Sequence, residues 1–196
     1  RNIAMGQGAL ESNAGGTSDN VAIGHGSLGY NTTGTRNTAV GSNALDANTT
    51  ASDNTAVGYN ALGSCVTSVD NTAVGSGALA LCTTGDENTA VGAGALDANT
   101  TGTNNTAVGR MAATAQTTAD NNTAIGYYAL MSATGGENNT AIGDHAGESC
   151  TTGQKNVFVG RYAGSGQVTT GDGSLWIARS NDPANNATTW IHGGNS

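Results

Sequence analysis

The three cysteines, whose thiols can form disulfides or bind metals, follow one spacing in this 196-residue chain. The sequence numbers of Cys65 and Cys82 differ by 17, and those of Cys82 and Cys150 differ by 68, which is four times 17. This spacing matches no metal-ligand motif, so we predict no metal site. If the spacing is one structural unit, Cys65 and Cys82 lie close enough for a disulfide, whereas Cys150 does not. We favour three free thiols that fill a turn and keep a Cys65–Cys82 disulfide as the alternative.

The other reactive side chains form no catalytic arrangement. His25, His145 and His192 stand at different places in the repeat described below, and no Ser, Cys or carboxylate pairs with them as a triad. The glycines form no phosphate-binding G-x-x-x-x-G-K-S/T loop. We therefore predict that the chain is not an enzyme and holds no cofactor.

Charge and hydropathy exclude two classes of partner. Six Lys and Arg stand against 14 Asp and Glu, which gives a net charge of -8 and no basic surface for nucleic acid. No apolar run approaches the roughly 20 residues that span a membrane, so we predict no membrane insertion. Acidic residues recur at the cysteine spacing at Asp53, Asp70 and Glu87, where repulsion favours a solvated edge over a shared Ca²⁺.

Four tyrosines are candidates for receptor contact: Tyr59, Tyr127, Tyr128 and Tyr162. Their large rings interrupt a sequence otherwise rich in small residues, and an aromatic face beside Asn and Thr suits stacking against a glycan. Packing between coils or chains explains the same rings, and we favour that explanation. Receptor contact stays the functional hypothesis for them.

A strict internal repeat carries all these residues. The pentapeptide Asn-Thr-Ala-Val-Gly, or a near variant, ends at ten glycines from Gly6 to Gly160, whose spacings are 18 once and 17 in every other case. The consensus is N-T-A-V-G-x-x-A-L-x-x-N-T-T-G-x-D, whose positions we number 1 to 17. Leu, Ile, Val and Phe make up only about 14% of the chain, a poverty typical of disorder. A disordered segment does not keep a fixed period, however, so we predict an ordered repeat protein.

This period is too short for a helical hairpin repeat and fits one coil of a parallel β-solenoid. We predict an all-β fold, a β-roll of about ten coils, with strands at positions 1–5 and 8–9 and a return turn at positions 12–15. The Gly at position 5 allows a tight turn. Residues 1–172 make up the predicted array, and residues 173–196 are a degenerate repeat that caps it.

Stacked coils turn each position into a column of like residues. Position 1 predicts a ladder of asparagine side chains that satisfies backbone groups in every coil. Its members are Asn2, Asn20, Asn37, Asn54, Asn71, Asn88, Asn105, Asn122, Asn139 and Asn156. Position 4 is always apolar and predicts the core column. Its members are Met5, Ile23, Val40, Val57, Val74, Val91, Val108, Ile125, Ile142 and Val159.

So thin a core needs support from outside each coil. Burial of one Val and one Leu contributes roughly 3–6 kcal/mol per coil, whereas ordering the coil costs about 1.5 kcal/mol per residue. Stacking of coils and association of chains must supply the rest, so we predict a homotrimer. The alanine column at position 3, from Ala4 to Ala141, is the expected seam between chains.

The repeat also resembles two known families. Asn-Thr-Ala-Val-Gly followed by Ala-Leu is similar to the head repeats of trimeric autotransporter adhesins, which form a left-handed parallel β-roll. The long period and the Thr-Thr-Gly turn resemble more closely the repeats of phage tail-fibre proteins, and Ser174–Arg179 resembles the region where such fibres approach a C-terminal chaperone. The resemblance implies an extracellular structural fibre on a virion surface, which attaches to a host through a glycan or protein receptor.

Two alternatives to the phage fibre stay open. The first is the head of a bacterial trimeric adhesin on the cell surface. The second is an ice-binding β-solenoid, because Thr recurs at position 2 from Thr38 to Thr140 and again at positions 13 and 14. Such columns would form flat arrays of hydroxyl groups.

Overall fold

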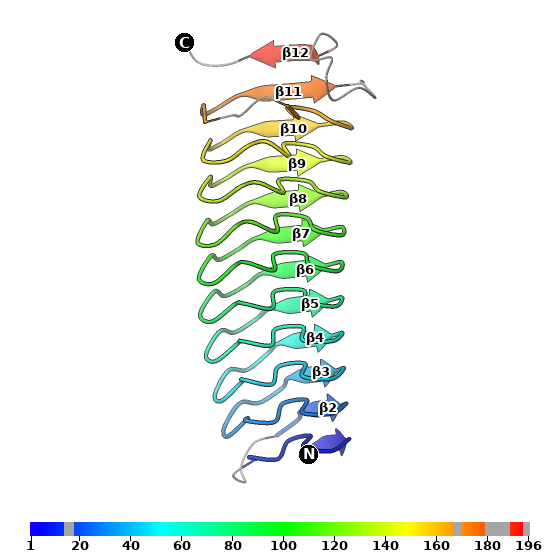
Figure 1. Cartoon of the computed structure of the whole chain (residues 1–196). Coiled ribbons are helices and arrows are strands. Elements are labelled where there is room, and N and C mark those ends of the chain that lie inside the picture. Colours follow the sequence, from blue (N-terminus) through cyan, green and yellow to red (C-terminus); the bar gives the residue numbers. More distant parts are fainter. Residues whose placement is uncertain (14–17, 167–169, 179–188, 194–196) are drawn as a thin grey trace.

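The computed structural model describes residues 1–13, 18–166, 170–178 and 189–193, which contain twelve β-strands and no helix. The strands are β1 (Ile3–Met5), β2 (Val21–Ile23), β3 (Thr38–Val40), β4 (Thr55–Val57), β5 (Thr72–Val74), β6 (Thr89–Val91), β7 (Thr106–Val108), β8 (Thr123–Ile125), β9 (Thr140–Ile142), β10 (Val157–Val159), β11 (Leu175–Ala178) and β12 (Thr189–Gly193). They form one sheet in sequence order (Figure 1). No membrane-spanning helix occurs in the described part of the chain.

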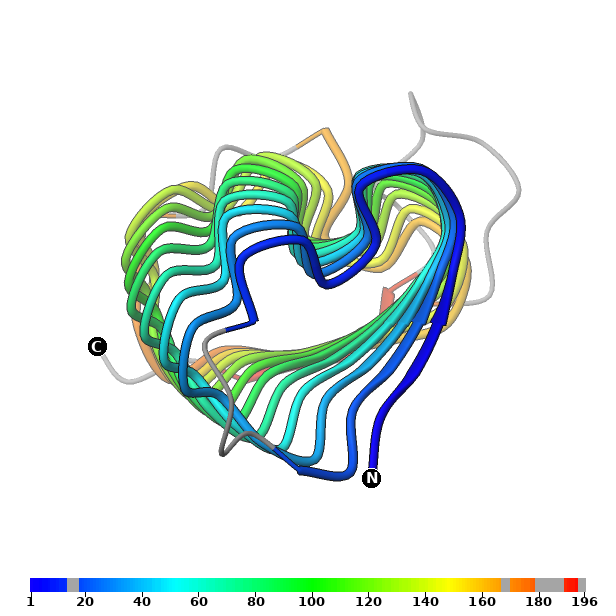
Figure 2. The same ribbon diagram turned by 90° about the horizontal axis from the view of Figure 1, so that it is seen from below.

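The sheet belongs to a parallel β-solenoid of about ten turns, as the repeat predicts. Each strand from β1 to β10 pairs in parallel with the next at the same position of the repeat, so that Ala39 lies opposite Ala56 and Ala56 opposite Ala73. Seen along the axis, successive coils follow one outline that is indented on one side (Figure 2). Only β12 reverses direction among the described strands, pairing antiparallel with β11 beyond the last regular coil. The repeat period therefore becomes columns of equivalent residues along the axis.

Each regular coil contains one strand of three residues, and the second strand predicted at positions 8 and 9 is wrong. Those positions form turns in which the Leu at position 9 is left-handed, with φ of 50° at both Leu62 and Leu79. An extended strand cannot contain a residue with that backbone angle. The turn points each Leu side chain into the solenoid, where it is fully buried from Leu28 to Leu130.

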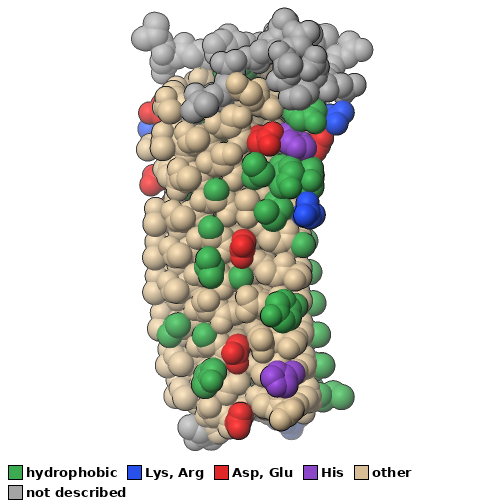
Figure 3. Space-filling view, in the orientation of Figure 1, with side chains coloured by type: hydrophobic (Ala, Val, Ile, Leu, Met, Phe, Trp, Pro, Cys, Tyr) green, Lys and Arg blue, Asp and Glu red, His purple; other side chains and the backbone are tan. Residues whose placement is uncertain are grey.

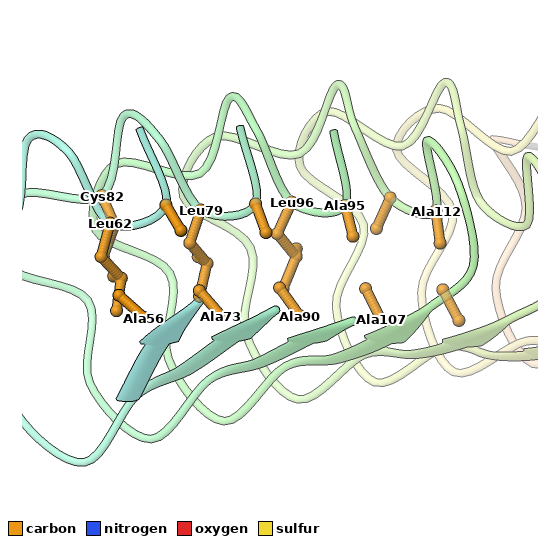
Figure 4. Close-up of a cluster of buried hydrophobic side chains, with 14 of the residues drawn as sticks. Ala56, Leu62, Ala73, Leu79, Cys82, Ala90, Ala95, Leu96, Ala107 and Ala112 are labelled. Carbon is orange, nitrogen blue, oxygen red and sulfur yellow. The ribbon is translucent and has the colours of Figure 1, made fainter. Parts of the chain in front are cut away.

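The interior is lined by alanine and leucine, and the prediction that position 4 forms the core is wrong. Ala73 on β5 is fully buried and faces Leu79 from the opposite wall, whereas Val74 is 36% exposed (Figure 4). Successive side chains of a strand point to opposite faces, so an inward position 3 forces position 4 outward. Every member of the predicted core column is exposed or partly exposed: Met5, Ile23, Val40, Val57, Val74, Val91, Val108, Ile125, Ile142 and Val159.

The same orientation corrects the predicted seam between chains. The alanines of position 3 are fully buried within the solenoid from Ala22 to Ala141, so they cannot contact a second chain. A small side chain is needed there because a leucine from the opposite wall occupies the space. The outward face of the sheet instead carries positions 2 and 4, which are Thr and Val in β3 to β7. We call this surface the sheet face.

The interior keeps its volume where the repeat departs from consensus. Phe158 replaces alanine at position 3 of the tenth coil and is fully buried. Glycines replace leucine at Gly147 and Gly164, and a Cβ on Gly164 would lie 2.5 Å from the Phe158 ring. A large side chain on one wall thus faces glycine, which has no side chain, on the other wall. Close packing of the interior requires this compensation of volume.

Each asparagine at position 1 ties two parts of the solenoid together. Its Oδ1 accepts the backbone N–H of the next asparagine, as Asn71 does from Asn88 at 2.9 Å and Asn88 does from Asn105 at 3.0 Å. Its Nδ2 donates to the return turn of its own coil, as Asn88 does to the Gly102 carbonyl at 2.8 Å. The side chains are buried from Asn20 to Asn156, which confirms the predicted ladder as a feature of the fold.

The glycine at position 5 permits the coils to approach at the end of each strand. Gly58 has a φ of 137°, and a Cβ there would lie 2.5 Å from the carbonyl oxygen of Gly75 in the next coil. The same glycine donates its N–H to the Val40 carbonyl in the previous coil at 2.8 Å. A larger residue would break this stacking, because its Cβ would collide with backbone atoms of the next coil, which cannot move aside as a side chain can.

Replacement of Leu79 by alanine should lower the free energy of unfolding by about 2–5 kcal/mol, because it opens a cavity in a fully packed interior. Val74→Ala in the same coil should cost under about 1 kcal/mol, because its side chain is partly exposed on the sheet face. Thermal unfolding followed by circular dichroism compares the two variants. Equal losses would contradict the assignment of the interior wall.

The asparagine ladder predicts a second loss of stability. Asn88→Ala should cost about 1–3 kcal/mol, because it leaves the buried Asn105 N–H without its acceptor. The Gly102 carbonyl loses one of its two donors and keeps the other, Asn99. The control is Thr101→Ala in the same coil, whose side chain is exposed. If both variants melt at the same temperature, the ladder does not stabilise the fold.

Candidate functional site

Three of the four tyrosines proposed for receptor contact meet in one surface cluster. Tyr127, Tyr128 and Tyr162 lie together with His145 on the turns that follow β8, β9 and β10. We call these four residues the aromatic cluster. Hydrophobic, histidine and charged side chains gather near the upper end of the described molecule (Figure 3). Tyr59 lies four coils before Tyr127, in the same column, and is 61% exposed without a ring contact to the cluster.

The rings of the aromatic cluster contact one another across three coils. The Tyr127 and Tyr128 centroids are 4.0 Å apart, and each ring meets His145 edge-on at 5.3 and 5.2 Å. Tyr162 lies 4.8 Å from His145 on the other side. The three contacts with His145 have the centroid separations of interacting aromatic pairs, and the two adjacent tyrosines lie closer still. The cluster is therefore a continuous aromatic surface and not a set of separate rings.

Charged groups hold the rings at both ends of the cluster. Arg110 lies 5.8 Å from the Tyr127 centroid and donates to its hydroxyl at 3.3 Å, and Arg161 lies 4.8 Å from the Tyr162 centroid. Asp144 accepts from Arg161 Nε at 2.7 Å and lies 2.9 Å from His145 Nδ1. A guanidinium over an aromatic face is attractive, so the two arginines add to the order of the rings.

The Asp144 carboxylate is the electrostatic anchor of this arrangement. Burial acts to raise its pKa, but the hydrogen bonds from Arg161 and His145 outweigh burial, and the pKa lies below its ordinary value. The carboxylate thus stays ionised and keeps both partners in place. The arrangement offers flat rings edged by hydrogen-bonding groups, which suits binding.

Backbone geometry explains why these side chains reach the surface together. Tyr128, His145 and Tyr162 all occupy position 7, where φ is 56–58°. The left-handed backbone of this turn aims the side chain outward in each coil, and the repeat period stacks the three. His145 was missed as a site residue by sequence reasoning, although its spacing of 17 from both tyrosines was available as a signal.

All three cysteines are buried as thiols in the return turn. At the same position Asn99 donates its side-chain amide to the Gly102 carbonyl at 3.0 Å. Cys82 makes the equivalent bond to Gly85 at 3.3 Å, so a thiol replaces the amide as donor. The structure thus has free thiols where the alternative placed a Cys65–Cys82 disulfide. Both sulfurs contact the Ser68 hydroxyl, Cys65 Sγ at 3.0 Å and Cys82 Sγ at 3.8 Å. Burial raises the pKa of the Cys65 thiol to about 11, which disfavours the reactive thiolate.

The charged column at position 17 lies on an exposed edge. Arg36 forms a salt bridge with Asp53, in which Nε lies 2.6 Å from Oδ1. Asp70 and Glu87 in the same column are exposed. Among the described residues, no group of three or more His, Cys, Asp or Glu could hold a metal ion.

The sheet face is the other extended surface of the molecule. Its position 4 side chains are apolar along the array, with exposed fractions of 37% at Ile23, 39% at Ile125 and 43% at Ile142. Position 2 contributes threonine from Thr38 to Thr140, and no charged residue occurs at either position. The result is a regular, uncharged and partly apolar surface.

Comparison of the chain with models of known protein families, with curated proteins and with solved structures finds no match.

Proposed function

We propose that the chain is a structural fibre protein without catalytic activity, the shaft or receptor-contacting part of a phage tail fibre outside the cell. The observation that carries the proposal is the in-register stacking of about ten equivalent coils, which makes an extended rod. On this rod the aromatic cluster is a localised feature suited to contact. The resemblance of the repeats to those of tail fibres supports the same role.

The sheet face supports association of three copies side by side. A long, partly apolar surface on a thin solenoid favours burial against an equivalent surface. Copies in the same direction and register would place identical uncharged columns together, so no like charges would meet on this face. In the proposed homotrimer the chains contact through positions 2 and 4.

Light scattering on the purified protein tests this assembly. The expected mass is three times the 19.2 kDa of one chain. Val91→Lys places a charge on the centre of the sheet face and should shift the mass toward one chain, because burial of an unpaired charge is costly. Thr101→Lys, on the exposed return turn of the same coil, should leave the trimer intact. A monomeric unsubstituted protein would contradict the proposal.

The aromatic cluster is the proposed contact for a host-surface glycan or protein. Flat rings bordered by arginine and aspartate groups offer stacking together with hydrogen bonding, the combination that polar ring-shaped ligands need. Tyr59 has none of the ring contacts and bordering charges that make the cluster continuous.

Binding to a microarray of bacterial surface polysaccharides tests the contact. The double variant Tyr127→Ser and Tyr128→Asn uses residues that the chain itself has at these positions, Ser42 and Asn43, so the backbone should be preserved. Its binding should fall about ten-fold or more, since stacking and hydrogen bonds are both lost. The control Tyr59→Ser should bind as the unsubstituted chain does. Equal losses in the two variants would place the contact elsewhere.

An ice-binding role is the second candidate, favoured by the outward threonine column of the sheet face. Regularly spaced threonines beside valines form an in-register array from β3 to β7. Thermal hysteresis and ice shaping at high protein concentration would support this role. Their absence would end it while leaving the fibre proposal unaffected.

A further inference from the structure

A cavity of about 290 Å³ lies at the N-terminal end of the array. Its lining comes from positions 6, 7, 10 and 11 of the first three coils, on either side of the inward-facing positions 8 and 9. These coils are far along the rod from the aromatic cluster. The cavity is therefore a separate feature, and its function is independent of the proposed contact.

Glycines keep the cavity hollow. A Cβ on Gly26 would lie 2.9 Å from Asn43 Oδ1, and a Cβ on Gly29 would lie 2.8 Å from Asp46 Oδ1. Oxygen atoms of the third coil thus project into space that side chains of the second coil would otherwise fill. At the other end of the rod, position 7 carries Tyr128 and its neighbours instead of glycine.

The cavity is acidic. Glu11 and Asp46 both line it, and neither Lys nor Arg does. Burial raises the pKa of Asp46, an effect that His25 partly offsets. No described residue donates a hydrogen bond to the Asp46 carboxylate. The Asp46 carboxylate is only partly buried, so water can still reach it and a cationic ligand would replace that water with charge-assisted hydrogen bonds.

We propose that this cavity binds a small ligand bearing a protonated primary amine, held between the Asp46 and Glu11 carboxylates. An ammonium group forms charge-assisted hydrogen bonds with carboxylates, and Glu11 of the first coil and Asp46 of the third both line the cavity. The Tyr30 ring, 62% exposed at the rim, offers an apolar face to the rest of the ligand. An anionic ligand would be repelled, and a neutral one would leave the charges uncompensated.

Titration with D-glucosamine slightly below neutral pH, followed by backbone amide shifts in NMR, tests the site. Saturable shifts should be centred on Gly8, Gly26 and Gly29. D-Glucose and N-acetyl-D-glucosamine, which lack the charged amine, should bind at least about ten-fold more weakly. Two variants separate charge from shape. Asp46→Asn removes the charge, and Gly26→Asn fills the cavity with a residue that position 7 already tolerates at Asn43 and Asn60.

Each variant has a matched control in a coil outside the cavity. Asp97 occupies the same position as Asp46 and also has a pKa raised by burial, while Gly77 occupies the same position as Gly26 with a φ of 68°. Asp46→Asn and Gly26→Asn should each weaken glucosamine binding about ten-fold or more. Asp97→Asn and Gly77→Asn should not. The proposal is overturned if glucosamine gives no saturable shifts, if the neutral sugars bind equally well, or if the controls weaken binding as much.

Discussion

The fold depends on one repeated interaction, the pair of hydrogen bonds made by the asparagine at position 1. Its side-chain oxygen accepts a hydrogen bond from the backbone N–H of the next coil, and its side-chain amide donates one to the return turn of its own coil, as at Asn88. The first bond joins coils along the axis, and the second closes each coil across the interior. Because both bonds are buried, a shift of register by one residue would leave polar groups unsatisfied in every coil.

That constraint explains why the interior can be so small. A coil held by its asparagine and by backbone hydrogen bonds needs only alanine on one wall and leucine on the other, as at Ala73 and Leu79. The replacement of this pair by Phe158 and Gly164 shows that total volume matters more than identity. Stability is then shared between neighbours, because no coil buries enough apolar surface to fold alone.

Surface positions are free to diverge within this frame. Position 7 is glycine or asparagine in the first six coils, methionine in the seventh and aromatic in the last three, although the backbone keeps a positive φ throughout. The same column therefore produces a hollow near Gly26 and a surface of rings around His145. Different binding surfaces can arise by substitution at one column without any change of fold.

The sequence by itself determined the period, the asparagine column, the return turn and the β-solenoid, because each requires only that identical residues recur in phase. Only the tertiary structure decided which face of the strand is buried, since alternation of Ala73 and Val74 fits either orientation. It also decided that Leu79 lies in a left-handed turn, because the dipeptide Ala-Leu gives no sequence indication of that backbone conformation. The contacts of His145 with Tyr128 and Tyr162 follow from stacking, which brings residues of successive coils together at the same position of the repeat.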